Sequence, residues 1–97
     1  MKIIAIDKIK SGVDLEQVLP HMKEEAKIAW GLYKSEIFRE MYFRQDKPGV
    51  VLIMECKNVE EAKNALAKLP LVKKNLIEFE IIPVGYFSPF EVLFSEK

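Results

Sequence analysis

Hydrophobic positions recur along this chain with two periods, and the periods predict four strands and two principal helices. Runs rich in β-branched and aromatic residues, which are typical of strands, span residues 2–9, 37–44, 50–56 and 76–84. Over residues 20–34 and 59–68 the apolar residues instead recur every three or four positions, the spacing of one helical face. The predicted order is therefore strand, helix, strand, strand, helix, strand.

Polar residues and prolines mark the ends of these elements. Capping boxes, which close the first turn of a helix, are predicted at Asp14 with Gln17 and at Asn58 with Glu61. Pro20 interrupts the first helical pattern, so we expect a short turn over residues 14–19 and then a helix to about Lys34. Asp, Pro and Gly within residues 45–49 indicate a hairpin, and Pro70 closes the second helix.

This order favours an α+β domain of ferredoxin-like type (βαββαβ). In such a domain a four-stranded antiparallel sheet carries both helices on one face. The 97 residues fit one domain, with a core over residues 1–84 and an aromatic tail over residues 85–97. No run of apolar residues reaches the length of a membrane-spanning helix.

Apolar surface exceeds what one copy of this fold covers, which predicts self-association. The two hairpin strands carry apolar residues on both sides: Phe38, Met41, Tyr42, Phe43, Ile53 and Met54. Helices cover one side only, and a second copy of the sheet is the simplest cover for the other. The tail is also too apolar for a free end, so we expect it to pack on a neighbouring subunit; the alternative is that it folds back on its own.

The helix before Lys34 has an unusually wide apolar arc, on the order of 200°. Its predicted core stripe, extended by Leu19 and Trp30, consists of Leu15, Met22, Ala26, Ala29 and Tyr33. Ile28 and Leu32 lie beyond that stripe and suggest a contact with the other helix or with another subunit. Glu25 lies inside the arc, one turn after His21. A carboxylate among apolar neighbours is a candidate acid or base; the alternative is a salt bridge to His21 or to a lysine.

Three residues of the strand at 37–44 are further candidates. If Phe43 pairs with Val51, Arg39 falls opposite Glu55, where it forms an ion pair or instead holds a ligand carboxylate with its planar fork. Glu40 and Tyr42 share one face of that strand and would line a pocket between sheet and helices. Alternatively, both residues lie on an edge strand and face solvent or a partner.

Charge and cysteine content restrict the class of function. Fifteen basic and fifteen acidic residues cancel, so no basic surface for nucleic acid and no polybasic membrane patch is expected. Cys56 is the only cysteine, which rules out an intrachain disulfide and favours a reducing, cytoplasmic location. One His, one Cys and four scattered glycines offer no usual metal site and no phosphate loop, so we expect no metal and no cofactor.

Several segments of the chain resemble the muconolactone isomerase family. They are Val59-Glu60-Glu61-Ala62, then Leu66-Ala67-Lys68-Leu69-Pro70-Leu71-Val72, and upstream Trp30 to Glu40 and Tyr42 to Leu52. The resemblance, to a bacterial branch whose function is largely unassigned, implies a dimeric α+β barrel with a small-molecule pocket. It also implies a cofactor-free shift of a double bond by proton transfer, and it sets Arg39 near a family arginine.

These observations lead to one principal hypothesis and two others. We expect a cofactor-free isomerase acting on a small acidic or cyclic metabolite, with Glu25 as proton carrier. His21, Glu40 or Tyr42 would assist, and Arg39 would orient the substrate. One alternative is a non-catalytic homo-oligomeric binding or assembly module. The other is a cofactor-free monooxygenase that holds an aromatic substrate among Trp30, Tyr33 and Tyr42.

Overall fold

The strand β1 (Lys2–Ile9) is one of the two central strands of the sheet on which the helices pack. The computed structural model describes residues 1–95. Its elements are β1 (Lys2–Ile9), α1 (Leu15–Val18), η1 (Leu19–His21), α2 (Met22–Lys34), β2 (Phe38–Phe43), β3 (Val50–Glu55), α3 (Val59–Leu66), α4 (Pro70–Lys73), β4 (Ile77–Val84) and η2 (Ser88–Phe94). No helix within residues 1–95 has the length and apolar composition needed to cross a membrane.

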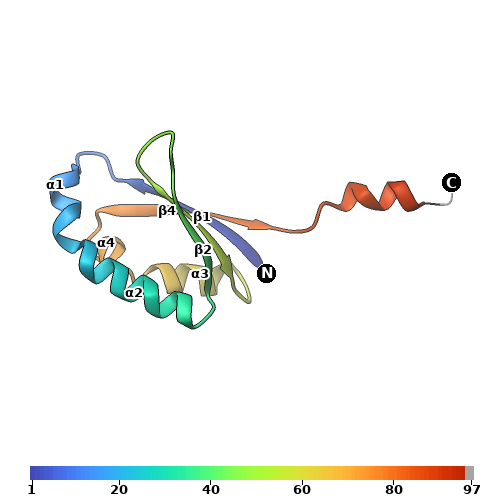
Figure 1. The fold of residues 1–97 in the computed structure, drawn as a ribbon, viewed down its shortest axis with the longest axis horizontal. Helices are drawn as coiled ribbons and strands as arrows, with labels where there is room; N and C mark the ends of the chain where they lie inside the picture. The colour runs from blue at the N-terminus through green and yellow to red at the C-terminus, as the bar shows by residue number, and fades with distance from the viewer. Residues whose placement is uncertain (96–97) are drawn as a thin grey trace.

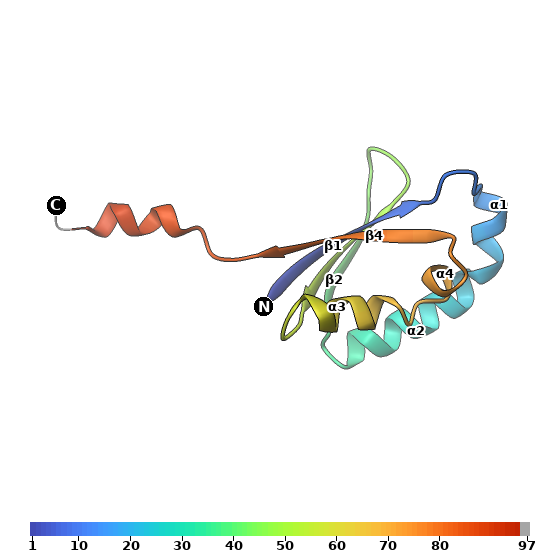
Figure 2. The ribbon, with the colours of Figure 1, turned by 180° about the vertical axis from the view of Figure 1, so that it is seen from behind.

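The sheet has the strand order β2-β3-β1-β4, and every neighbouring pair is antiparallel. Figures 1 and 2 show α2, α3 and α4 together on one side of it. This is the ferredoxin-like α+β arrangement, so the predicted fold is confirmed. The helices cover one face of the sheet, and the other face is open.

The predicted helix starts are confirmed, with one difference in detail. Asp14 and Gln17 form the reciprocal capping box at α1. At α3 the Asn58 side chain accepts the Glu61 N–H at 2.8 Å, but the Glu61 carboxylate accepts the N–H of Lys57 rather than that of Asn58. After α3, the chain forms the further turn α4, which begins at Pro70 because proline suits a first helical position.

The core beneath the sheet consists of two hydrophobic clusters. The larger one comprises Ile3, Ala5, Leu32, Phe38, Leu52, Met54, Cys56, Ala62, Ala65, Leu66 and Leu69. The smaller one comprises Val18, Leu71 and Ile77, with Ile9 and Met22 packed against it. Along β1, Asp7 lies between the residues of the two clusters. Along α2, Glu25 occupies the same intermediate position.

The predicted core stripe of α2 is wrong in part. Leu32, placed beside the stripe from the sequence, is the buried residue of α2, whereas Tyr33 is 43% and Trp30 57% exposed. Ile28 and Glu24 line a depression together with Pro70 of α4, so that flank of α2 packs on α4. Met22 and Ala29 of the predicted stripe pack against the core clusters, whereas Ala26 and Tyr33 are left exposed where α2 faces β2 across a gap.

The predicted hairpin register is wrong by one residue. Phe43 pairs with Val50, not Val51, and a bulge at Arg39 absorbs the extra residue before Phe38 pairs with Met54. Arg39 does not lie within ion-pair distance of Glu55 in the described chain; its Nε donates to the Glu36 carbonyl at 2.7 Å. The Glu55 carboxylate contacts the amino group of Met1 at 2.6 Å instead.

The tail leaves the end of β4 and lies away from the sheet and helices (Figure 1). Its apolar side chains are 61–84% exposed: Tyr86, Phe87, Phe90, Val92, Leu93 and Phe94. Phe87 and Phe90 contact each other edge to face at 5.0 Å. The tail therefore does not fold back on its own domain in this structure; residues 96–97, also assigned to the tail from the sequence, lie outside the described residues.

Glycine substitutions are expected to separate backbone strain from packing. A Cβ at Gly49 would meet Arg44 Cδ at 3.1 Å and Asp7 Oδ1 at 3.3 Å, and its φ of +152° disfavours other residues. Gly49→Ala should lower the free energy of unfolding by about 1–3 kcal/mol. Gly31→Ala, in open space on a helix, should raise it by about 0.5–1 kcal/mol. Urea denaturation measures both changes.

Gly12→Ala is the matched control, since Gly12 also has a positive φ (+84°) but nothing lies within 4 Å of an added Cβ. It should lose less stability than Gly49→Ala. Equal losses at the two positions would show that the contact with Arg44 and Asp7 contributes nothing.

Candidate functional site

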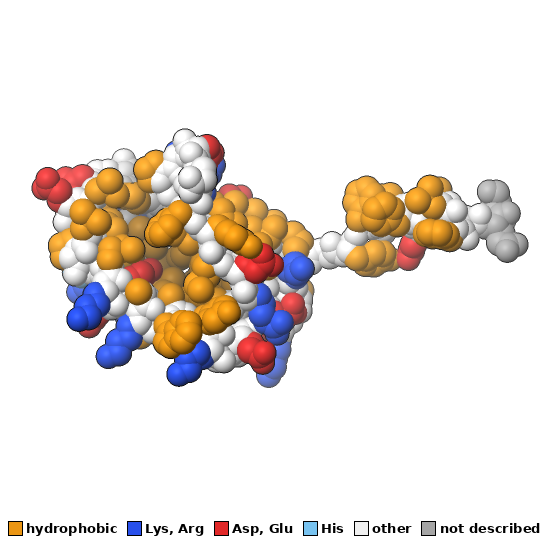
Figure 3. Space-filling model, in the orientation of Figure 1, with side chains coloured by type: hydrophobic (Ala, Val, Ile, Leu, Met, Phe, Trp, Pro, Cys, Tyr) orange, Lys and Arg blue, Asp and Glu red, His pale blue; other side chains and the backbone are white. Residues whose placement is uncertain are grey.

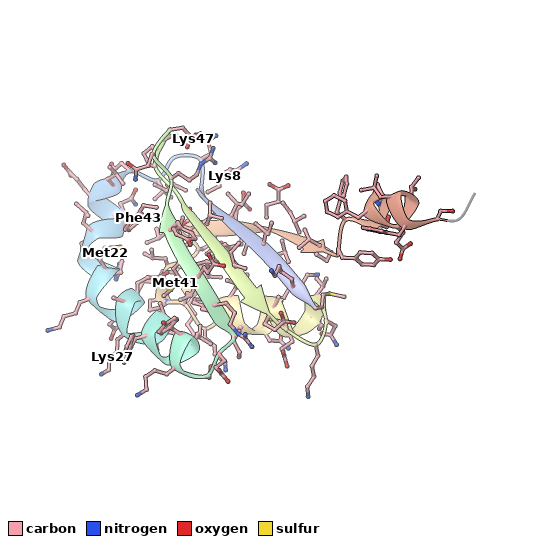
Figure 4. All side chains as sticks on the ribbon, turned by 45° about the vertical axis from the view of Figure 1, so that its right-hand side comes forward. Lys8, Met22, Lys27, Met41, Phe43 and Lys47 are labelled. Atoms are coloured by element: carbon pink, nitrogen blue, oxygen red, sulfur yellow. The ribbon has the colours of Figure 1, made fainter. Side chains whose placement is uncertain are left out.

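The gap between α2 and β2 is an open groove with apolar walls. Figure 3 shows this face hollowed between the two elements and ringed by hydrophobic side chains. Met41 and Phe43 lie on the helix-facing side of β2, because they pair with Leu52 and Val50, and they are 40% and 68% exposed. Figure 4 places them across the gap from Met22 of α2. Aromatic or aliphatic parts of a ligand would find a surface here.

Trp30 and Tyr33 form a pair of exposed aromatic rings on α2. Their rings stack with centroids 5.6 Å apart and planes inclined by 29°. Both remain about half exposed, although indole and phenol rings of this size are usually well covered in a folded domain. The two residues predicted to contact a substrate are therefore accessible to a ligand.

Glu25 is held beneath the sheet by the first turn of α4. Its Oε1 accepts the Leu71 N–H at 3.0 Å, which joins α2 to α4. Half-burial raises the pKa of the Glu25 carboxyl; the Leu71 N–H opposes that rise, and the negative charge of Asp7 adds to it. The predicted carboxylate in an apolar arc thus has the raised proton affinity that acid–base chemistry requires.

Asp7 is a second half-buried carboxylate, and sequence reasoning missed it. Its Oδ1 accepts the Val50 N–H at 2.7 Å, so the side chain ties β1 to the hairpin. Burial raises the pKa of the Asp7 carboxyl, and the Val50 N–H and the Arg44 charge oppose the rise. The alternation of side chains along β1 could have identified it, because Asp7 lies on the same face of the strand as the buried residues Ile3 and Ala5.

The negative charge of Asp7 raises the pKa of the Glu25 carboxyl, and along its own element each carboxylate lies between residues of the two core clusters. Each is oriented by a single backbone N–H, and within residues 1–95 neither carboxylate accepts a second hydrogen bond. Two carboxylates arranged this way can take a proton from one position of a ligand and return it at another.

The other predicted catalytic residues do not join this pair. His21 ends η1 and is half-buried, and in the described part of the chain no hydrogen bond links it to Glu25. Glu40 and Tyr42 pair with Ile53 and Val51 and therefore lie on the open face of the sheet, away from the helices. There the Tyr42 hydroxyl donates to the Glu40 carboxylate, which raises the pKa of the phenol.

Arg39 lies on the bulge, exposed, with its Nε committed to a backbone carbonyl. Arg44, which directly follows β2, is the arginine whose charge lowers the pKa of the Asp7 carboxyl. Cys56 is buried, and burial raises the pKa of its thiol, which disfavours a nucleophilic thiolate. No group of three or more His, Cys, Asp or Glu side chains that could hold a metal ion occurs in residues 1–95.

Compared with known proteins, the chain matches no protein-family model and no curated protein. The arrangement of Glu25, Asp7 and the apolar groove is therefore the main guide to function. It combines two carboxylates of raised pKa with a surface suited to a small, partly apolar molecule.

Proposed function

We propose that this protein is a cofactor-free isomerase that moves a proton between two carbon positions of a small acidic or cyclic metabolite. The observation that carries the proposal is the pair of half-buried carboxylates, Glu25 and Asp7, that lies between the core clusters beside an open apolar groove. Burial of both groups raises their proton affinity toward the range in which a general base works near neutral pH.

The chemistry needs no other participant. One carboxylate takes a proton from the γ-carbon of an α,β-unsaturated carbonyl group, and the electron pair of that C–H bond moves through the conjugated system to give a dienolate. The other group, as a carboxylic acid, then returns a proton at the carbon next to the carbonyl, and the double bond shifts to the β,γ position. The backbone N–H groups of Leu71 and Val50 hold the two carboxylates in place throughout.

The resemblance of residues 30–40, 42–52 and 59–72 to the muconolactone isomerase family supports the same reaction class. It also supports assembly of two copies through the open sheet face. On that face lies a half-buried apolar stripe made of Ile4, Ile6, Val51, Ile53, Ile82 and Val84. In this proposal the aromatic tail packs on the neighbouring copy.

Muconolactone in D₂O is the first substrate to test. We expect the wild-type protein to move the double bond of the lactone and to introduce deuterium at the carbon next to the carbonyl. Proton NMR measures both changes. Turnover should be equal in the presence and absence of O₂, whereas a strict O₂ requirement would favour a monooxygenase. Absence of both isomerisation and deuterium exchange across a panel of unsaturated lactones and keto acids would contradict the proposal.

A further inference from the structure

The guanidinium of Arg44 is already occupied by a carboxylate of its own hairpin. Nε donates to Asp46 Oδ1 at 2.9 Å and Nη2 donates to Oδ2 at 2.6 Å, which is the two-pronged geometry of a strong arginine–carboxylate pair. The Asp46 side chain is 65% exposed and the Arg44 side chain 25%. Asp46 is therefore the partner that can turn away into water.

Arg44 is held in place by contacts that do not involve Asp46. Its backbone N–H donates to the Gly49 carbonyl at 2.8 Å, which closes the hairpin. Its Cδ lies against the Cα side of Gly49, where an added Cβ would meet it at 3.1 Å. Loss of the Asp46 contact would thus leave the Arg44 side chain in place, and its Nε and Nη2 donors would be free to bind a different carboxylate.

Arg44 lines a hollow large enough for a small ligand. Its volume is about 630 Å³, within the usual range of small-molecule sites. Its lining combines cations, the proposed proton carrier of β1 and apolar surface: Lys8, Arg44, Lys47, Asp7, Ile9 and Phe79. Two acidic side chains also line it, and Glu78 is paired with Lys8 at 3.9 Å. An acid group bound at Arg44 would therefore lie in the same hollow as Asp7.

We propose that Asp46 stands in for the acid group of a ligand, so that a small carboxylate-bearing molecule displaces it from Arg44. The released Asp46 turns to solvent, and Lys47 adds a second positive charge beside the bound carboxylate. This inference rests on the proposed function in one respect, because it places the ligand beside Asp7. It goes further by naming the group that the hairpin recognises and an internal competitor for it.

Benzoate, a single carboxylate on an apolar ring, is a suitable probe. The full-length protein labelled with ¹⁵N is titrated at constant ionic strength, and the Arg44 Nε–H and hairpin amide signals are followed by NMR. Removing the internal competitor should strengthen binding, so Asp46→Asn should lower the Kd for benzoate about two- to fivefold. Arg44→Lys keeps the charge but not the fork and should lose saturable binding.

Glu78→Gln is the matched control, since it also removes one negative charge, from the lining of the hollow, without removing the partner of the Arg44 guanidinium. Benzamide is the neutral control ligand and should not bind. The proposal is overturned if Asp46→Asn leaves the Kd unchanged, if Glu78→Gln lowers it equally, or if benzoate produces no saturable shift in any variant. Because this readout needs no turnover, it can succeed where the isomerase assay fails, and the reverse also holds.

Discussion

Replacing Glu25 by Gln is expected to lower the rate of the proton shift by about 10²–10⁴-fold while leaving the fold intact. Glutamine has nearly the same volume, and its Oε1 can still accept the Leu71 N–H that Glu25 accepts at 3.0 Å. It cannot carry the proton. The rate is measured by NMR as deuterium incorporation into the substrate, and Asp7→Asn should cause a loss of the same kind.

Stability should move in the opposite direction from activity in this variant. A carboxyl whose pKa is raised by folding stabilises the folded state at pH values below its ordinary pKa, and that contribution is lost as the pH rises through the raised pKa. Because the Glu25 pKa is raised, Glu25→Gln should remove part of the decline in Tm above the ordinary glutamate value. Thermal unfolding followed by circular dichroism at pH values from about 4 to about 8 measures this change in the dependence of Tm on pH.

Glu24→Gln is the control for both measurements. Glu24 precedes Glu25 on α2 but is exposed, so this variant should retain activity and the wild-type dependence of Tm on pH. Full activity in Glu25→Gln would contradict the assignment of Glu25 as proton carrier. Loss of activity together with collapse of the fold would instead assign Glu25 a structural role at the α2–α4 contact.

Truncation after Gly85 is expected to convert the proposed homo-oligomer into smaller species. The exposed apolar side chains of Tyr86, Phe87, Phe90, Val92, Leu93 and Phe94 are removed, while β4 is kept complete to Val84. Burial of one such side chain stabilises an assembly by about 1.5–3 kcal/mol, so the whole tail accounts for several kcal/mol per subunit. Sedimentation velocity at several protein concentrations measures the change in assembly.

Tyr86→Phe is the control for the truncation. It removes the hydrogen bond from the Tyr86 hydroxyl to the Glu91 carboxylate, 2.7 Å long, but keeps the apolar ring. Its assembly should equal that of the wild-type protein. An oligomer that survives truncation would mean that the tail is not the subunit contact, and the open sheet face would then be the surface to mutate.

The order and type of the elements could be predicted from the sequence because their determinants are local. The β-branched run in β1, the Asp14 cap and the turn at Pro20 all act within a few residues of their own positions. Antiparallel order followed from short connections and from the ferredoxin-like succession of strands and helices. The turn α4 was not predicted because four residues are too few to show a helical periodicity, and a proline at position 70 also suits the end of α3.

The site was predictable in part. Glu25 could be found because a carboxylate inside a helical apolar arc conflicts with its surroundings, and that conflict is visible in a periodicity of 3.6 residues. Asp7 was missed, although strand alternation places it on the same face as Ile3 and Ala5. Its importance comes from Val50 and Arg44, which are distant in sequence.

The sequence by itself thus determined the fold and one of the two proposed proton carriers. Tertiary structure alone decided the rest. A bulge at Arg39 changed the hairpin register, and Glu40 and Tyr42 lie on the open face of the sheet. The packing of α2 left Ala26 and Tyr33 of the predicted core stripe exposed, although Met22 and Ala29 pack against the core. Such choices depend on how whole elements pack, and no local pattern contains that information.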